Sequence, residues 1–338
     1  MNEYFDIPIA LFMFKRSDTL LKIIAVLSKI KPKKLYLLSD QGRSEEEIRI
    51  VEKTRNLIEN AIDWDCEIIK NYASENRGVY ENIGEGARWV FQQEKKAIFL
   101  EDDNLPEISF FSYCKELLDK YENNNKILWI CGTNYLGEYT SDYSYMFTQH
   151  LLPCGWASWS NKFLKYYDGQ MLTYNNEYKR KIFCSTYKSK PLLKQRLQSL
   201  DGEYHRKETL NKFKSWDYQM LFSLRSNDML GISPVYNQIR NIGADEFSTH
   251  GGTSLDKIMT KRFCEIPTRE LEFPLKHPKH IAIDQDYERL IGNIILLPLK
   301  MRIKIQINLW VKKVLHLDPY SSLLVEIKRI VHMTKKNI

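Results

Sequence analysis

The chain has 338 residues, of which 43% are hydrophobic and 12% aromatic, enough for one large core or two modest ones. This composition excludes a disordered chain, and we expect one large domain with an appendage. The six cysteines are scattered, with no CxxC pair and no short spacing, which argues against a zinc site and a disulfide framework. We therefore expect a reducing, cytoplasmic setting, because the acidic N-terminus also lacks the features of a signal peptide.

The net charge of +7 is placed unevenly along the chain. From residue 300 to the end, nine Lys or Arg residues stand against two acidic ones, an excess of seven. The longest apolar stretch, residues 290 to 299, contains Pro298 and falls well short of the ~20 residues that a transmembrane helix needs. We therefore expect no membrane span but a basic surface for an acidic partner, namely anionic lipid rather than nucleic acid.

The first part of the chain alternates between apolar runs and helical patterns. Residues 8 to 14 and 35 to 39 are nearly unbroken apolar runs, typical of strands buried on both faces, and helical spacing fills residues 18 to 30 between them. The pattern continues with helices predicted at 45–62, 79–93 and 109–121 and strands at 66–70, 96–100 and 127–131. Such alternation predicts an α/β fold with a mostly parallel sheet and helices on both faces.

The regular alternation ends after residue 131. Residues 132 to 175 are rich in Gly, Tyr and Trp, as expected of loops that form a site. Residues 176 to 214 are basic and helical in pattern, and a further helix is predicted from 217 to 225.

Three consecutive carboxylates, Glu101, Asp102 and Asp103, follow directly on the predicted strand 96–100. Ligands of open α/β sheets bind beyond the carboxyl ends of the strands. Consecutive carboxylates leave a strand in different directions, so one can bind a hard divalent cation while its neighbour reaches a ribose or a water ligand. A solvated acidic turn is the alternative, and the apolar run that leads into the triplet favours the site.

Six motifs follow one another along the chain: Arg16 after the first strand, Asp40 after the second, the acidic triplet, Leu152 to Trp156, Trp216-Asp217, and Ser248 to Gly251. In these motifs and their order, over about residues 7 to 255, the chain resembles the nucleotide-sugar transferases of the GT-A type, with one inserted residue in the last motif. Within them it is similar to the inverting N-acetylglucosaminyltransferase I-like group. The spacing before Trp156 and the Tyr-rich stretch 135 to 147 depart from the family's pattern.

The resemblance implies a GT-A fold and a role for each motif. Asp103 would bind Mn²⁺ or Mg²⁺, and Glu101 and Asp102 would contact the nucleotide sugar. Asp40 would accept a hydrogen bond from uracil, which implies a UDP-sugar. Asp217 would be the general base that takes the proton of the acceptor hydroxyl in a single inverting displacement. Residues 1–131 would form the nucleotide-binding half and 132–283 the acceptor-binding half of one catalytic domain, with a basic helical tail at 284–338.

Other residues are candidates by their chemistry. Arg16 and Arg77 would pair with phosphates. His250 would be a second metal ligand or a phosphate contact. We expect an acceptor platform from three indole rings, Trp156, Trp159 and Trp216, because aromatic faces stack on sugar rings. Purely structural alternatives stay open for several of these residues. They are core packing for the indoles, an N-terminal helix cap for Asp217, an Asx turn for Asp40 and a plain turn at Arg77.

The tail predicts an amphipathic helix. Its apolar positions recur every three or four residues with lysines between them: Leu296, Leu299, Ile303, Ile307, Trp310, Val311 and Val314. A helix of this kind lies in a membrane interface or packs on the core, and the sequence favours neither.

Together these features predict an inverting hexosyl- or N-acetylhexosaminyltransferase. It would move a sugar from a nucleotide-sugar donor to a hydroxyl of a glycan. If the tail binds a membrane, the acceptor would be a lipid-linked glycan at the inner face of the cytoplasmic membrane. By resemblance the setting is a bacterial surface polysaccharide: O-antigen, capsule or LPS. A metal-dependent phosphodiester hydrolase is the first alternative, although it would need a second metal and more clustered ligands. A non-catalytic glycan-binding protein of the same fold is the second.

Overall fold

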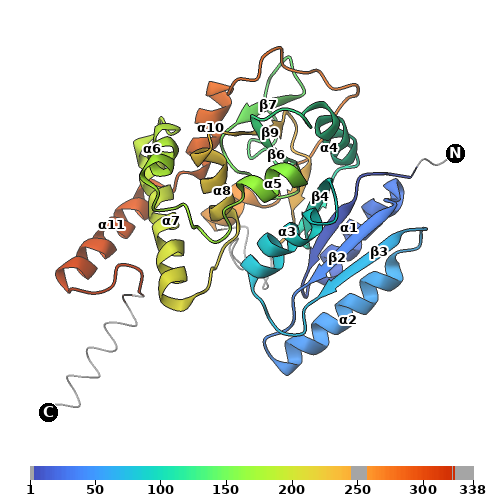
Figure 1. The fold of residues 1–338 in the computed structure, drawn as a ribbon, viewed down its shortest axis with the longest axis horizontal. Helices are drawn as coiled ribbons and strands as arrows, with labels where there is room; N and C mark the ends of the chain where they lie inside the picture. Colours follow the sequence, from blue (N-terminus) through green and yellow to red (C-terminus); the bar gives the residue numbers. More distant parts are fainter. Residues whose placement is uncertain (1–3, 245–256, 322, 324–338) are drawn as a thin grey trace.

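The computed structural model describes residues 4–244, 257–321 and 323 (Figure 1). Its centre is an eight-stranded sheet of order β3-β2-β1-β4-β8-β6-β9-β7, beside a two-stranded sheet of β10 and β5. The strands are β1 (Ile9–Met13), β2 (Lys34–Ser39), β3 (Glu67–Tyr72), β4 (Lys96–Glu101), β5 (Asn104–Pro106), β6 (Ile127–Cys131), β7 (Tyr145–Thr148), β8 (Trp156–Trp159), β9 (Leu230–Pro234) and β10 (Ile239–Asn241).

The helices follow the strands along most of the chain. They are α1 (Ser17–Ile30), α2 (Glu45–Ala61), the π-helical turn η1 (Tyr80–Glu85), α3 (Gly86–Phe91), α4 (Ser109–Lys120), α5 (Ser160–Tyr166), α6 (Glu177–Ser185), α7 (Lys190–Leu210), α8 (Asp217–Ser226), α9 (Ile258–Phe263), α10 (Gln285–Ile295) and α11 (Leu299–Val314). The helices predicted at 18–30, 45–62, 109–121 and 217–225 are thus confirmed to within a residue or two.

Most strands of the large sheet run in one direction. β3, β2, β1 and β4 pair in parallel, as do β6 and β9. β8 is antiparallel to both β4 and β6, and β7 is antiparallel to β9. The mostly parallel α/β sheet expected from the sequence is therefore confirmed, with two reversed strands that the sequence did not predict.

Helices cover both faces of this sheet. Trp156 and Trp159 stand three residues apart on β8, so their side chains point to opposite faces. Trp156 packs near Phe91 of α3 and Phe163 of α5, whereas the indole N–H of Trp159 donates to the Leu118 carbonyl of α4 at 2.9 Å. α3 and α5 therefore lie on one face and α4 on the other, as expected for this class.

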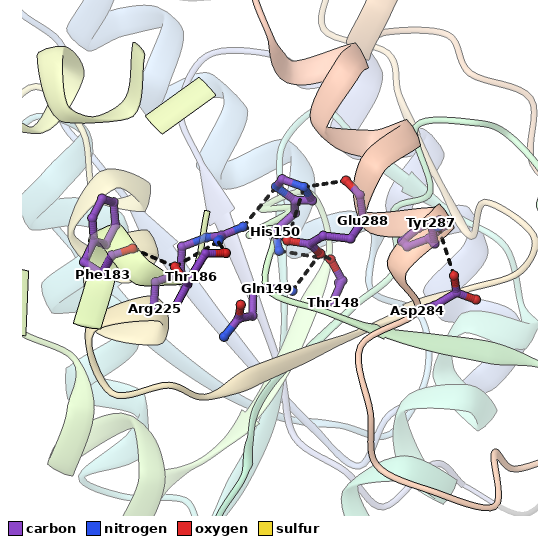
Figure 2. A network of polar contacts seen from close by, with 9 residues as sticks. All are labelled: Thr148, Gln149, His150, Phe183, Thr186, Arg225, Asp284, Tyr287 and Glu288. Carbon is purple, nitrogen blue, oxygen red and sulfur yellow. Dashed lines mark hydrogen bonds and ion pairs between the residues drawn. The ribbon is translucent and has the colours of Figure 1, made fainter. Parts of the chain in front are cut away.

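A buried polar network joins the end of β7 to two helices (Figure 2). The guanidinium of Arg225 on α8 donates to the Glu288 carboxylate of α10 at 2.8 Å. Glu288 also accepts from the Thr148 hydroxyl and from the Gln149 backbone N–H, at 2.5 and 3.0 Å. His150 completes the network, with its Nε2 2.9 Å from the Glu288 carbonyl and its Nδ1 3.4 Å from Arg225. These contacts compensate two charges that burial would otherwise make costly.

The network corrects the predicted start of the tail. We expected the appendage to begin at residue 284, but α10 buries Tyr287, Ile291 and Ile295 in the main core and carries Glu288. The exposed appendage therefore begins with α11, after Pro298. None of the helices in the described ranges has the length and apolar character needed to cross a bilayer.

The His150 imidazole makes stability depend on pH. Burial lowers the pKa of His150 to about 4, although the neighbouring Glu288 carboxylate opposes the shift. In the unfolded chain the pKa of a histidine is about 6.5, so between the two values the unfolded state binds more protons. The stabilising contribution of neutral His150 is therefore complete above pH ~6.5 and is lost as the pH falls towards 4.

We expect urea unfolding to show this loss directly. Between pH 6.5 and 4 the wild type should lose on the order of 2 kcal/mol of unfolding free energy more than a His150→Gln variant, which cannot take up the proton. His280→Gln, which changes an exposed histidine, should behave like the wild type. Equal losses in the wild type and in His150→Gln would contradict this assignment.

Candidate functional site

The acidic triplet lies where two adjacent parallel strands end. Glu101 is the last residue of β4, and Arg16 follows the neighbouring strand β1. The Arg16 guanidinium donates from Nη1 to Asp102 Oδ1 at 2.9 Å and to Asp103 Oδ2 at 3.4 Å. Because parallel strands present their carboxyl ends at one edge, the predicted Arg16 and triplet meet at the expected place in the sheet.

The carboxylate of Asp103 is held in place by its neighbours. The buried Asn104 side chain donates to Asp103 Oδ1 at 2.6 Å and accepts the Gly155 backbone N–H at 2.8 Å. The Ile242 N–H donates to the Asp103 carbonyl at 2.8 Å, and a Cβ on Gly243 would lie only 2.4 Å from Asp103 Oδ2. Only glycine can approach the carboxylate this closely at position 243.

Asn104 is a site residue that the sequence interpretation missed. It links the triplet to the stretch Leu152 to Trp156, so two motifs separated by some fifty positions become one structure. The sequence contained a signal for this role, an asparagine directly after three carboxylates, because an amide side chain can donate to a carboxylate and accept a backbone N–H. The structure adds that Asn104 is buried.

Burial and mutual repulsion both act on the carboxyl groups of the triplet. Burial, then the charges of Asp103, Asp102 and Asp217, raise the pKa of the Glu101 carboxyl well above its ordinary value, and Arg16 opposes the shift. Burial also raises the pKa of Asp102 to about 6, against the attraction of Arg16 and with the repulsion of Asp103. The Asp102 and Asp103 side chains are only 12% and 19% exposed, so water screens these charges weakly.

The chemistry of the triplet fits a divalent cation held by few protein ligands. Among the residues that the structure describes, no three His, Cys, Asp or Glu side chains come together as a complete metal site. Mg²⁺ and similar hard cations are commonly held by one or two carboxylates, with water and substrate phosphates as the remaining ligands. Asp103 has the right chemistry for that arrangement, whereas His250, the second predicted ligand, lies outside the described residues.

Asp217 is the first residue of α8. The N-cap position belongs to Trp216 and makes no side-chain cap bond, so the alternative that Asp217 serves as the helix cap is not what the structure has. Its Oδ1 accepts a hydrogen bond from the Ser215 hydroxyl. The negative charge of Asp217 contributes to the raised pKa of Glu101, so Asp217 interacts electrostatically with the triplet.

Asp40 organises a loop of the protein itself. It is buried, and one carboxylate oxygen accepts the backbone N–H groups of Gln41 and Arg77 at 2.9 and 2.7 Å. The other accepts from the Gly78 backbone and the Asn76 amide at 2.9 and 3.1 Å. Four donors thus occupy the carboxylate. A structural role, holding residues 76 to 78 in place, is enough to explain why this buried position is an aspartate. Its contact with uracil stays a prediction.

The Arg77 side chain lies beside this loop. Its Nη2 donates to Asn71 Oδ1 at 3.1 Å, and no acceptor within the described residues lies in hydrogen-bond reach of its buried Nε. Gly78 follows with a φ of +86°, a conformation that favours glycine, and its α-carbon faces open space. The turn explains Gly78 without a ligand, and the phosphate contact of Arg77 stays a prediction.

The predicted acceptor platform is wrong for all three indoles. Trp156 stacks between Phe99 and Trp129, with ring centroids at 4.0 and 4.2 Å, and Trp216 lies against it at 5.7 Å. Trp159 is equally buried and faces α4. Because other side chains cover these rings, no sugar can stack on them, and core packing explains both Trp156 and Trp159 as well as Trp216.

Comparisons with known proteins give only distant likenesses. No family model matches the chain, and no curated protein matches its sequence. One similar solved structure is a UDP-glucose pyrophosphorylase complexed with UDP-glucose, at 11% identity over 70% of this chain and 94% of that one, with a TM-score of 0.34. Another is mouse xyloside xylosyltransferase 1, at 10% identity over 66% and 83% of the two chains, with a TM-score of 0.33.

A third is the 4-diphosphocytidyl-2C-methyl-D-erythritol synthase of Anaerococcus prevotii, at 11% identity over 50% and 83%, with a TM-score of 0.30. At these TM-scores the likeness carries no inference about activity.

The electrostatic repulsion within the triplet predicts that replacing Glu101 by a neutral residue stabilises the protein. The pKa of Glu101 is higher in the folded state than in the unfolded chain. As the pH rises above the unfolded pKa, Glu101 therefore lowers the free energy of unfolding, and this loss grows until the pH reaches the folded pKa. Glu101→Gln removes this loss. In the absence of divalent cations, its melting temperature at pH 8 should exceed that of the wild type by about 2–4 °C, the shift expected for ~1 kcal/mol.

The difference should shrink at pH 5, because this pH lies only slightly above the pKa of about 4.3 that a glutamate has in the unfolded chain. Glu75→Gln, which changes an exposed carboxylate of the same type, should leave the melting temperature unchanged at both pH values. A Glu101→Gln protein that melts at or below the wild-type temperature at pH 8 would show that the triplet is not under electrostatic strain.

Proposed function

We propose that this protein is a glycosyltransferase that moves a sugar from a nucleotide-sugar donor to a hydroxyl of a glycan, with inversion at the anomeric carbon. One observation carries the proposal. At the carboxyl edge of a parallel sheet, a largely buried carboxylate triplet that pairs with Arg16 lies close enough to a separate carboxylate, Asp217, for the charge of Asp217 to act on Glu101. In such a transfer the triplet would bind the cation that stabilises the leaving group, and Asp217 would act as the general base.

In the proposed reaction Asp217 accepts the proton of the acceptor hydroxyl. The acceptor oxygen forms a bond to the anomeric carbon while the bond from that carbon to the phosphate oxygen breaks on the opposite face. A nucleoside diphosphate departs with the bonding electrons. The hydrogen bond from Ser215 keeps one oxygen of Asp217 oriented, so the other is available to the incoming hydroxyl.

The donor diphosphate would lie over the triplet. A Mn²⁺ or Mg²⁺ ion held by Asp103 would supply charge compensation for the leaving diphosphate. Arg16 stands between Asp102 and Asp103 and would share its guanidinium with the same phosphates. Gly243 packs so closely against Asp103 that a side chain at position 243 would collide with the carboxylate.

The finer features of the proposal rest on the resemblance of the motifs. They are a UDP-sugar as donor, a hexosyl or N-acetylhexosaminyl group as cargo, and an acceptor glycan of a bacterial surface polysaccharide. A cytoplasmic site of action agrees with six free thiols. No observation among the described residues favours the hydrolase alternative, because no clustered His and Asp side chains provide a second metal site.

Two substitutions test the division of labour between the carboxylates. Asp217→Asn should lower sugar transfer by about 10²–10⁴-fold, because the proton acceptor is lost, while the affinity for the nucleotide sugar stays within a few fold. Asp103→Ala should lose both transfer and the cation-dependent affinity. The measurements are donor binding by calorimetry with Mn²⁺ or with EDTA, over a panel of nucleotide sugars, and transfer or slow donor hydrolysis.

Asp142→Asn is the matched control, because Asp142 is an exposed carboxylate far along the chain from either motif. It should leave binding and turnover unchanged. Normal transfer by Asp217→Asn would refute the assignment of the base. Failure of every nucleotide sugar to bind, with or without Mn²⁺, would refute the glycosyltransferase proposal. Donor binding without turnover in the wild type would favour the glycan-binding alternative.

A further inference from the structure

α11 carries an exposed apolar stripe. Its members have the highest exposures among the apolar residues of the helix, between 50% and 65%: Leu299, Ile303, Ile307, Trp310 and Val314. They are spaced by four, four, three and four positions, so in an α-helix they line a single face. Five large apolar side chains in one row on the surface mark an interaction site, since isolated exposed apolar residues are ordinary but contiguous ones are not.

The helix is fixed to the protein by residues outside the stripe. Gln195 of α7 donates to the Ile295 carbonyl at 3.1 Å and accepts the Leu297 N–H at 2.8 Å, which sets the turn that leads into α11. Lys194 of α7 donates to the Gln306 side chain at 2.7 Å. In Figure 1 α11 lies next to α7 at the outer edge of the molecule, away from the large sheet. The stripe therefore has a defined position on the surface.

At the other end, the chain folds back beside α11. The ammonium of Lys312 donates to the carbonyls of Pro319 and Ser321 at 2.8 and 2.7 Å. His205 of α7 stacks on Tyr320, with ring centroids 4.5 Å apart, and approaches Asp318 at 3.3 Å. Residues 318 to 321 therefore pack beside α11 and α7, and the five stripe residues remain exposed.

Positive charge borders the stripe on both sides. At 100° per residue, Lys300 and Lys304 flank it on one side and Lys313 on the other, and all three are exposed. α11 contains no Asp or Glu. An apolar row between lysines matches a lipid bilayer surface that contains anionic headgroups, in which the row enters the acyl boundary while the lysines remain at phosphate depth.

We propose that the stripe of α11 docks this protein on an anionic phospholipid membrane. A second copy of the chain is a poorer occupant, because face-to-face helices would bring like-charged lysines together. Five residues also fall far short of the ~20–30 per side that a stable protein interface uses. The docking is independent of the proposed transfer reaction, and if that reaction is right it holds the site close to acceptors carried by lipid.

Vesicle sedimentation of the full-length protein tests the proposal without any nucleotide sugar. The wild type should bind vesicles of phosphatidylcholine with phosphatidylglycerol at least about tenfold more strongly than phosphatidylcholine alone, and added salt should weaken that binding. Ile303→Asp/Ile307→Asp should lower it by about tenfold or more. Both sites are exposed, so the fold should survive, which circular dichroism verifies. Leu172→Asp is the matched control, since Leu172 is exposed at 78% outside α11.

Trp310 reports contact directly. Its fluorescence should shift to shorter wavelength with anionic vesicles, and the shift should vanish in Trp310→Phe. Unchanged vesicle binding by the double Asp variant, or no binding of the wild type at low salt, would overturn the proposal. So would a wild-type dimer in light scattering that the double variant abolishes, because the stripe would then serve a second copy. None of these readouts depends on transferase activity.

Discussion

The mutual repulsion of Glu101, Asp102 and Asp103 is the constraint on which the rest of the site depends. The Arg16 guanidinium lies among them, and burial weakens the screening of their charges by water. Carboxylates in this state favour protonation unless a cation joins them, which is why the raised pKa values of Glu101 and Asp102 are informative. The fold must therefore hold the triplet against its own repulsion.

Local structure provides that restraint. The short β5–β10 ladder pairs Asn104 with Asn241 immediately beyond the triplet, and the Asn104 side chain ties Asp103 to Gly155. Gly243 closes on the carboxylate from the other side. Carboxylates held in this way are restrained to one arrangement despite their repulsion.

The core beneath the site connects its two halves. Phe99 of β4, two residues before Glu101, stacks on Trp156, which in turn contacts Trp129 and Trp216. Trp216 directly precedes Asp217. Trp156 and Trp216, which the sequence offered for the acceptor, instead belong to a buried column of rings that connects the triplet with Asp217, so their effect on the site is positional. At the far end of the chain, the Arg225–Glu288 pair draws α10 into the same core and leaves α11 outside it.

The sequence by itself determined the elements whose signals are local. Apolar runs and helical spacing identify β1, α1, β2, α2 and β4, and the carboxyl end of β4 identifies the triplet, because each pattern is complete within a dozen residues. The apolar face of α11 was legible for the same reason. The meeting of Arg16 with Asp102 required the strand order, because only the pairing of β1 with β4 brings their carboxyl ends side by side.

Only the tertiary structure decided what depends on neighbours far along the chain. β8, four residues in a loop-like stretch, becomes a strand because β4 and β6 offer hydrogen-bond partners on both sides. Trp156, Trp159 and Trp216 read equally as core or as a sugar platform until their covering rings are known. The carboxylate of Asp40 is filled by donors from residues 76 to 78, and α11 is exposed where α10 is buried. A sequence pattern states what a side chain can do, but burial and partners decide which of those things it does.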